Sequence, residues 1–161
     1  MKYKVTHTFP VSLEKLLHAR EERYQHLDQF PDLKNVTLLE EKKEGNIITQ
    51  KRKVSLEGSL PVVLQAALSD LSLIEESTFD TATNTHVFKI APPGKDNVFV
   101  IKGKSVYQST GASTSERSYD LDVNSGLLFV SPIVEKAIEE IHKHSLEKDR
   151  NSIAKFLGVE I

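Results

Sequence analysis

The sequence predicts one α+β domain, spanning residues 1–161, in which a curved antiparallel sheet of about six to seven strands lies against one long C-terminal helix. Three observations predict this class. Several segments alternate between polar and apolar residues, which is typical of strands with one buried face. Residues 131–157 place apolar side chains at steps of three and four, as a helix with one apolar face does. The length of 161 residues suits one domain, and no repeat or low-complexity linker divides the chain.

The first 31 residues predict a strand, a proline stop and a short helix. Residues 2–9 alternate in polarity, and Pro10 ends the strand because proline cannot donate a hydrogen bond to a sheet. Ser12 is a suitable N-cap for a helix over residues 13–19, and residues 20–30 are expected to continue as a short polar helix or turn. The better-buried face of the strand consists of Tyr3, Val5, His7 and Phe9.

Six further strands are expected before the C-terminal helix. The first two flank a Gly-Asn turn at residues 44–46 and form a hairpin. Residues 60–68, which come after this hairpin, are almost entirely apolar and form either a buried helix or a mobile lid. The C-terminal helix starts at Ser131-Pro132, since proline suits a first helical turn, and stops before Gly158. The six strands cover residues 36–43, 47–56, 71–81, 85–91, 98–108 and 115–123.

Composition excludes several classes of protein. The chain has no Cys, so it has no disulfide, thiolate metal site or cysteine nucleophile. The net charge of −2 is scattered and there is no Trp, so we expect no nucleic-acid partner. The short basic run Lys51-Arg52-Lys53 is expected to be a solvated strand face. With no signal peptide expected and no apolar run of about 20 residues, we expect a cytoplasmic protein without an integral membrane segment.

The order of these elements resembles the helix-grip fold of the START/Bet v 1-like (SRPBCC) superfamily. The resemblance is carried by the strand ending in Phe9-Pro10, the helix that Ser12 caps, and the helix over residues 131–157. Within the superfamily the chain is similar to the PRELI-like lipid-transfer group at residues 58–64 (GSLPVVL), and to bacterial families without an assigned function. The resemblance implies a cavity between sheet and helix that holds an apolar small molecule or a lipid.

The candidate ligand-binding residues lie on the faces that this fold turns toward the helix. The alternative is that their side chains simply fill the core, and Gly103 marks either empty space or a bulge in a long strand. The PRELI-like group often has basic residues in its lid, whereas residues 59–71 contain no Lys or Arg, which argues against an anionic phospholipid. The candidates are His7, Phe99, Ile101, Tyr107, Tyr119, Leu121, Ile133, Ala137 and Ile141.

No motif for catalysis, metal binding or cofactor binding stands out. Residues 103–105 (GKS) resemble the end of a phosphate-binding loop, but Val98 stands where that motif needs glycine. Glu139-x-x-His142 has the spacing of a di-iron helix but no second copy, so a polar helix face is expected. We therefore predict no catalytic residue, no metal site and no cofactor.

Three functions remain open at this point. The favoured one is non-enzymatic binding or carriage of an apolar small molecule or lipid. The second is an enzyme of the cyclase or hydratase kind, which needs a polar pair in the cavity, such as His7 with Tyr107 or Tyr119. The third is an interaction module in which residues 60–68 dock onto a partner. The sequence determines neither the ligand nor the oligomeric state.

Overall fold

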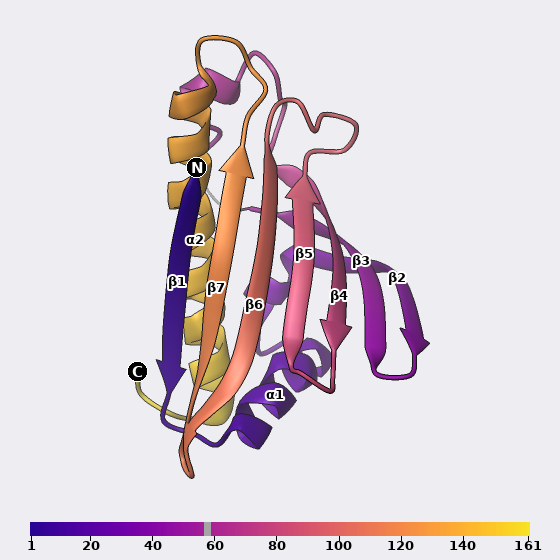
Figure 1. Ribbon diagram of the computed structural model, residues 1–161, viewed down its shortest axis with the longest axis vertical. Helices are drawn as coiled ribbons and strands as arrows, with labels where there is room; N and C mark the ends of the chain where they lie inside the picture. The colour runs from indigo at the N-terminus through magenta and orange to yellow at the C-terminus, as the bar shows by residue number, and fades with distance from the viewer. Residues whose placement is uncertain (57–58) are drawn as a thin grey trace.

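In the computed structural model, which describes residues 1–56 and 59–161, seven antiparallel strands form one curved sheet (Figure 1). Their order is β1-β7-β6-β5-β4-β3-β2, so the first strand pairs with the last and not with the second. The predicted helix-grip architecture is confirmed. The strands are β1 (Lys2–Phe9), β2 (Val36–Glu44), β3 (Ile47–Ser55), β4 (Ser72–Asp80), β5 (Thr85–Ala91), β6 (Val100–Gly111) and β7 (Thr114–Asn124).

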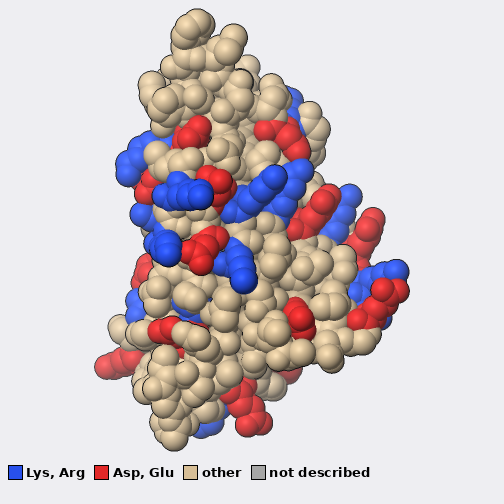
Figure 2. All heavy atoms as spheres, viewed as in Figure 1, with Lys and Arg blue, Asp and Glu red and all other residues tan. Residues whose placement is uncertain are grey.

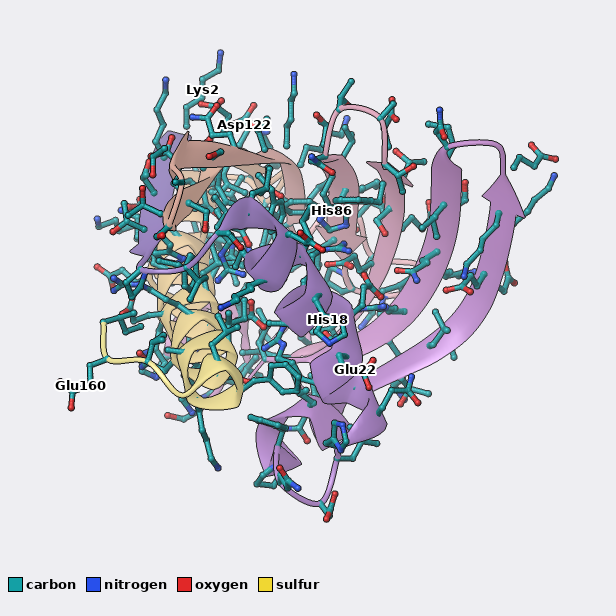
Figure 3. All side chains as sticks on the ribbon, turned by 90° about the horizontal axis from the view of Figure 1, so that it is seen from below. Lys2, His18, Glu22, His86, Asp122 and Glu160 are labelled. Carbon is teal, nitrogen blue, oxygen red and sulfur yellow. The ribbon has the colours of Figure 1, made fainter. Side chains whose placement is uncertain are left out.

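Two described α-helices, α1 (Leu13–Glu22) and α2 (Ser131–Leu157), lie inside the curve of the sheet (Figures 1 and 3). The Ser12 hydroxyl caps α1 by accepting a hydrogen bond from the Lys15 N–H at 3.3 Å. α2 has the predicted bounds and ends at Gly158, whose φ of 69° is a left-handed conformation that glycine adopts without strain. None of the described helices is long and apolar enough to cross a membrane. Short 3₁₀ helices are η1 (Arg23–Gln25), η2 (Pro31–Asn35) and η3 (Val62–Leu64).

The ends of β6 differ from the prediction. The strand begins two residues late, because the Val98 N–H donates to the Lys95 carbonyl at 3.0 Å and so belongs to a turn. It also runs on to Gly111, which pairs with Thr114 of β7 after a register shift. The loop expected at residues 109–114 is therefore a tight turn, and β6 and β7 form one long hairpin.

The apolar segment of residues 60–68 is neither a regular helix nor fully exposed. Its only helical part is η3. Leu64 and Leu68 are buried in the core, whereas the Val62 side chain is 83% exposed. The segment is thus held to the core by some of its side chains, and its action as a mobile lid remains a prediction. Gly58, which is part of the PRELI-like match, lies outside the described residues.

One end of the molecule exposes apolar side chains where η3 meets the start of α2. Leu128 is 81% exposed and Phe129 is 97% exposed. Figure 2 shows this end, at the top, without a visible charged side chain. Ile133 also lies here and is 60% exposed, which differs from its predicted place against the sheet. The reason is helical phase, because Val134 and Ile138 occupy the inward stripe and a side chain one position away points elsewhere.

Buried apolar side chains form two clusters on the concave side of the sheet. The larger one packs the strands against the first half of α2 and includes Phe99, Ile101 and Leu121. The smaller one joins α1 to the last turns of α2 through Leu16 and Ile153.

Gly103 marks a tightly filled point in this core, so the expectation of empty space beside it is wrong. A β-carbon at Gly103 would lie 2.4 Å from Cζ of Phe88 and 2.6 Å from Cδ2 of Leu121. The other interpretation, that Gly103 marks a bulge in the long strand, is also wrong for the β6–β7 pairing, because the register shift of that pairing falls between Ser109 and Gly111. The glycine is needed because the Phe88 ring occupies the space of its missing side chain.

We expect the change Gly103→Ala to lower the free energy of unfolding by about 1–3 kcal/mol, because the added methyl overpacks the core. The control is Lys102→Ala on the exposed face of the same strand, which should be nearly neutral. Urea unfolding followed by circular dichroism measures both. Equal stabilities of Gly103→Ala and the wild type would contradict the tight packing of Phe88 on Gly103.

Candidate functional site

A cavity of about 220 Å³ lies between the concave face of the sheet, the end of α1 and the second half of α2. Figure 3 looks at the molecule from this end and shows α1 between α2 and the β2–β3 side of the sheet. The apolar part of the wall comprises Leu33, Val36, Val54, Leu56, Phe88, Ile90, Tyr107, Tyr119 and Leu146. The polar part comprises Arg20, Glu21, Arg23, Tyr24, Asn35, Arg52, Ser55, Glu75, His86, Arg117, His142, Ser145, Lys148, Asp149 and Ser152.

A buried ionic group forms one side of the wall. The Asp149 carboxylate of α2 accepts from Arg117 Nη1 of β7 at 2.6 Å and from Arg23 Nη2 of η1 at 2.8 Å. Arg23 Nη1 also donates to the Ser152 hydroxyl at 2.9 Å. Burial acts to raise the pKa of Asp149, but the charges of Arg23 and Arg117 outweigh it and hold that pKa well below its usual value. The carboxylate therefore stays ionised between the two guanidinium groups.

His7 lies behind this ionic group and not on the cavity wall. Its Nδ1 accepts from Arg117 Nε at 3.3 Å, and its Nε2 is 3.3 Å from a carboxylate oxygen of Glu147. Burial and the Arg117 charge lower the pKa of His7 to about 4. His7 is therefore a neutral core histidine that helps to orient Arg117, and a direct contact with ligand remains a prediction.

His142 of α2 brings a buried imidazole to the cavity wall. The Tyr3 hydroxyl lies 2.8 Å from His142 Nδ1, and burial lowers the pKa of His142 to about 4. The expected polar helix face is wrong at this position, because His142 is 4% exposed and Glu139 is 8% exposed. Glu139 accepts from the Lys143 ammonium at 2.8 Å. Among the described residues, no group of His, Asp and Glu is arranged to hold a metal ion.

Two further arginines stand on the α1 and β3 sides of the cavity. The Arg52 guanidinium carbon lies 4.8 Å from the centroid of the Tyr24 ring, and that of Arg20 lies 4.2 Å from the Phe79 ring. The basic run of residues 51–53 was expected to be a solvated strand face. Arg52 departs from this expectation, because its half-buried side chain forms part of the cavity wall.

Glu75 and His86, both half-buried, lie near these two arginines on the concave face. Burial raises the pKa of Glu75, and the charges of Arg52 and Arg20 oppose that shift. His86, labelled in Figure 3, has its pKa lowered to about 3 by burial and by the same two arginines. The imidazole is therefore neutral near pH 7 and adds no positive charge to the wall.

The structure brings only two of the predicted ligand residues to the cavity, Tyr107 and Tyr119. Phe99, Ile101 and Leu121 belong to the larger core cluster. Ala137 and Ile141 are half-buried on α2 outside the cavity wall, and Ile133 and His7 lie where described above. The ligand roles of all these residues remain predictions.

The arginines of the wall were missed by sequence reasoning. For Arg117 a signal was present, since it has the same parity in its strand as Tyr119 and Leu121. For Arg23 none was present, because no periodicity marks the inward side of a single 3₁₀ turn.

The family model described as a protein of unknown function, DUF2505, matches residues 4–157. The chain belongs to this family. A search of the curated proteins finds no match.

Solved structures show the same fold at low identity. One is a protein of Thermus thermophilus, with 12% identity, a TM-score of 0.63, and coverage of 96% of this chain and 95% of that one. A START superfamily protein of Mycobacterium smegmatis has 15% identity, a TM-score of 0.61 and coverage of 96% and 98%. The Zhui aromatase/cyclase of Streptomyces sp. R1128 has 12% identity, a TM-score of 0.61 and coverage of 95% and 90%. The START/Bet v 1-like fold is thereby shown for this DUF2505 chain.

We expect acid to destabilise the protein through its buried neutral histidines. An unfolded His has a pKa of about 6.5, whereas that of folded His142 is about 4, so between these values the unfolded state binds more protons. Stability should therefore fall as the pH is lowered from about 6.5 to about 4, and His142 alone accounts for about 2 kcal/mol by pH 5.

The variant His142→Gln should lose less stability than the wild type between pH 7 and pH 5, because the amide does not titrate. Urea unfolding at both pH values measures the difference. His144→Gln, two positions along on the exposed side of α2, is the control and should behave as the wild type does. If His142→Gln lost as much stability as the wild type, His142 would not be buried in its neutral form.

Proposed function

We propose that this protein binds an apolar small molecule in the cavity beneath α2 and does not catalyse a reaction of it. The observation that supports this most directly is the cavity of about 220 Å³ itself, which is walled by Phe88, Ile90 and Leu146 on its apolar side. For comparison, an apolar cavity of about 150 Å³ admits benzene. The volume thus favours a compact ligand, such as a two-ring aromatic, over a lipid with two acyl chains.

The comparisons support the same proposal in a general way. Proteins with this fold include an aromatase/cyclase and a START superfamily protein. Ligand sites of globular proteins are mostly apolar concavities with a few polar groups that fix orientation, and this cavity has both kinds of wall. We place this binding in the cytoplasm and expect no nucleic-acid partner.

We expect naphthalene-2-carboxamide, an uncharged two-ring probe, to bind with an affinity that isothermal titration calorimetry can measure. The variant Ser145→Trp puts an indole into the cavity from α2 and should weaken binding roughly tenfold or more by filling the site. The control is His144→Trp, which adds the same indole to the exposed side of the helix.

Native mass spectrometry of protein purified from cells is the second measurement, and it should show a bound organic mass. No bound mass together with no binding of the carboxamide would overturn the proposal. Equal weakening by both tryptophan variants would place binding outside the cavity.

A second candidate function is an enzyme of the cyclase or hydratase kind, and one observation favours it. The cavity wall is not wholly apolar, and His142 on that wall is 2.8 Å from the Tyr3 hydroxyl. A neutral imidazole fixed by a tyrosine can donate or accept a proton at its other nitrogen. A cyclase-like reaction of a ketone begins with removal of a proton from the carbon atom next to the carbonyl group.

Exchange of the methyl protons of 2-acetylnaphthalene with solvent deuterium tests this second candidate. An enzyme should accelerate the exchange above the buffer rate, and Tyr3→Phe should remove the acceleration. Tyr24→Phe changes a tyrosine of the wall outside the His142 pair and is the control. Binding of the ketone without faster exchange would count against catalysis and leave the binding function intact.

A further inference from the structure

We propose that the ligand of this cavity carries an anionic oxygen group, such as a carboxylate, at one end of its apolar body. This inference rests on the proposed binding function and adds the chemical class of the ligand. It is carried by two features of the wall, its excess of arginine and a buried N–H of Arg23.

The wall has more cationic than anionic side chains. Its arginines are Arg20, Arg23, Arg52 and Arg117, and its acidic members are Glu21, Glu75 and Asp149, so the arginines alone exceed the acidic side chains by one positive charge. The whole chain has a formal net charge of −2, so this excess is opposite in sign to the rest of the molecule. Charge inside a partly buried cavity is poorly screened by salt, and the excess attracts an anion.

None of the three wall carboxylates is free to balance the remaining positive charge. Asp149 serves both Arg117 and Arg23. Glu21 is exposed and paired with its neighbour Arg20. Glu75 faces Arg52 across the β3–β4 pairing, and burial makes its ionised form less favourable than that of a carboxylate in water. One carboxylate between two guanidinium groups leaves positive charge that an incoming anion can balance.

Arg23 supplies the second observation. Its side chain is 2% exposed and forms part of the wall, and its Nε–H has no hydrogen-bond partner among the described residues. A buried N–H without a partner costs about 1–3 kcal/mol, and more when the group is charged. The two Nη groups of Arg23 are occupied by Asp149 and Ser152, so Nε is the donor of this guanidinium that lacks a partner. Nε is covered by its neighbours, and a small shift of the Arg23 side chain on ligand binding would turn it toward an oxygen of the ligand.

Arg52 is placed to assist without belonging to the Asp149 group. Its guanidinium lies over the Tyr24 ring, which holds the plane of the group while its N–H edges remain available. Ile90 lies on the row of residues that runs through Glu75 to Arg52 across the sheet. An amphipathic acid therefore fits with its oxygen atoms near Arg23 and Arg52 and its rings against Phe88 and Ile90.

The experiment compares 2-naphthoate with naphthalene-2-carboxamide, which has the same shape and no charge. Calorimetry at low ionic strength should show naphthoate binding roughly tenfold or more tightly, since charge-assisted hydrogen bonds are about twice as strong as neutral ones. The change Arg52→Gln should weaken naphthoate about fivefold and the carboxamide by less, because the uncharged amide loses a hydrogen bond but no ion pair. Lys53→Gln is the matched control, because it removes the same charge from the exposed side of β3.

A second variant, Arg23→Lys, keeps the positive charge and removes the Nε–H donor, and it should also weaken naphthoate selectively. Thermal melts confirm that each variant is folded before its affinity is compared. Equal affinity of the wild type for both probes would overturn the anionic ligand class while the binding function stands. Failure of both probes to bind would overturn the inference, and together with the absence of a bound mass in native mass spectrometry it would also overturn the function on which the inference rests. Equal losses in Arg52→Gln and Lys53→Gln would attribute the preference to net charge and overturn the site.

Discussion

The carboxylate of Asp149 joins three elements that are far apart in the chain. It binds Arg117 of β7, which is 32 residues away, and Arg23 of η1, which is 126 residues away. Through these contacts the second half of α2 is tied both to the sheet and to the segment that follows α1. Ionised groups lose much hydration when they are buried, so such a group holds only when its partners are all in place. The position of α2 over this end of the sheet depends on it.

The cavity lies where the apolar packing between α2 and the sheet gives way to the ionic group of Asp149, Arg23 and Arg117. The first half of α2 packs directly on the sheet through Val134 and Ile138, which belong to the larger core cluster. Further along, the inward side of the helix carries His142 and Asp149, whose partners are polar and fixed in direction. Hydrogen bonds set distances and angles that apolar packing does not require, so the side chains cannot close the remaining gap without losing them.

The sequence predicted the faces of the strands better than the place of the site. Tyr107 and Tyr119 were correctly put on the inward face and do line the cavity. Phe99, Ile101 and Leu121 share that face but lie in the filled core. Alternation tells which side of the sheet a residue occupies, but it does not tell how far along the sheet the helix stays in close contact. Gly103 shows the same limit, because its space is filled by Phe88 of a neighbouring strand.

What the sequence by itself determined is local: the strand periodicities, the cap of α1 at Ser12, and the bounds of α2 between Ser131 and Gly158. These follow from backbone chemistry and from a repeat of two or 3.6 residues, which a short segment contains in full. What only the tertiary structure decided is the meeting of Arg23, Arg117 and Asp149, and with it the charged cavity under the second half of α2. No local period encodes a contact across 126 residues, because the folding of the whole sheet brings those side chains together.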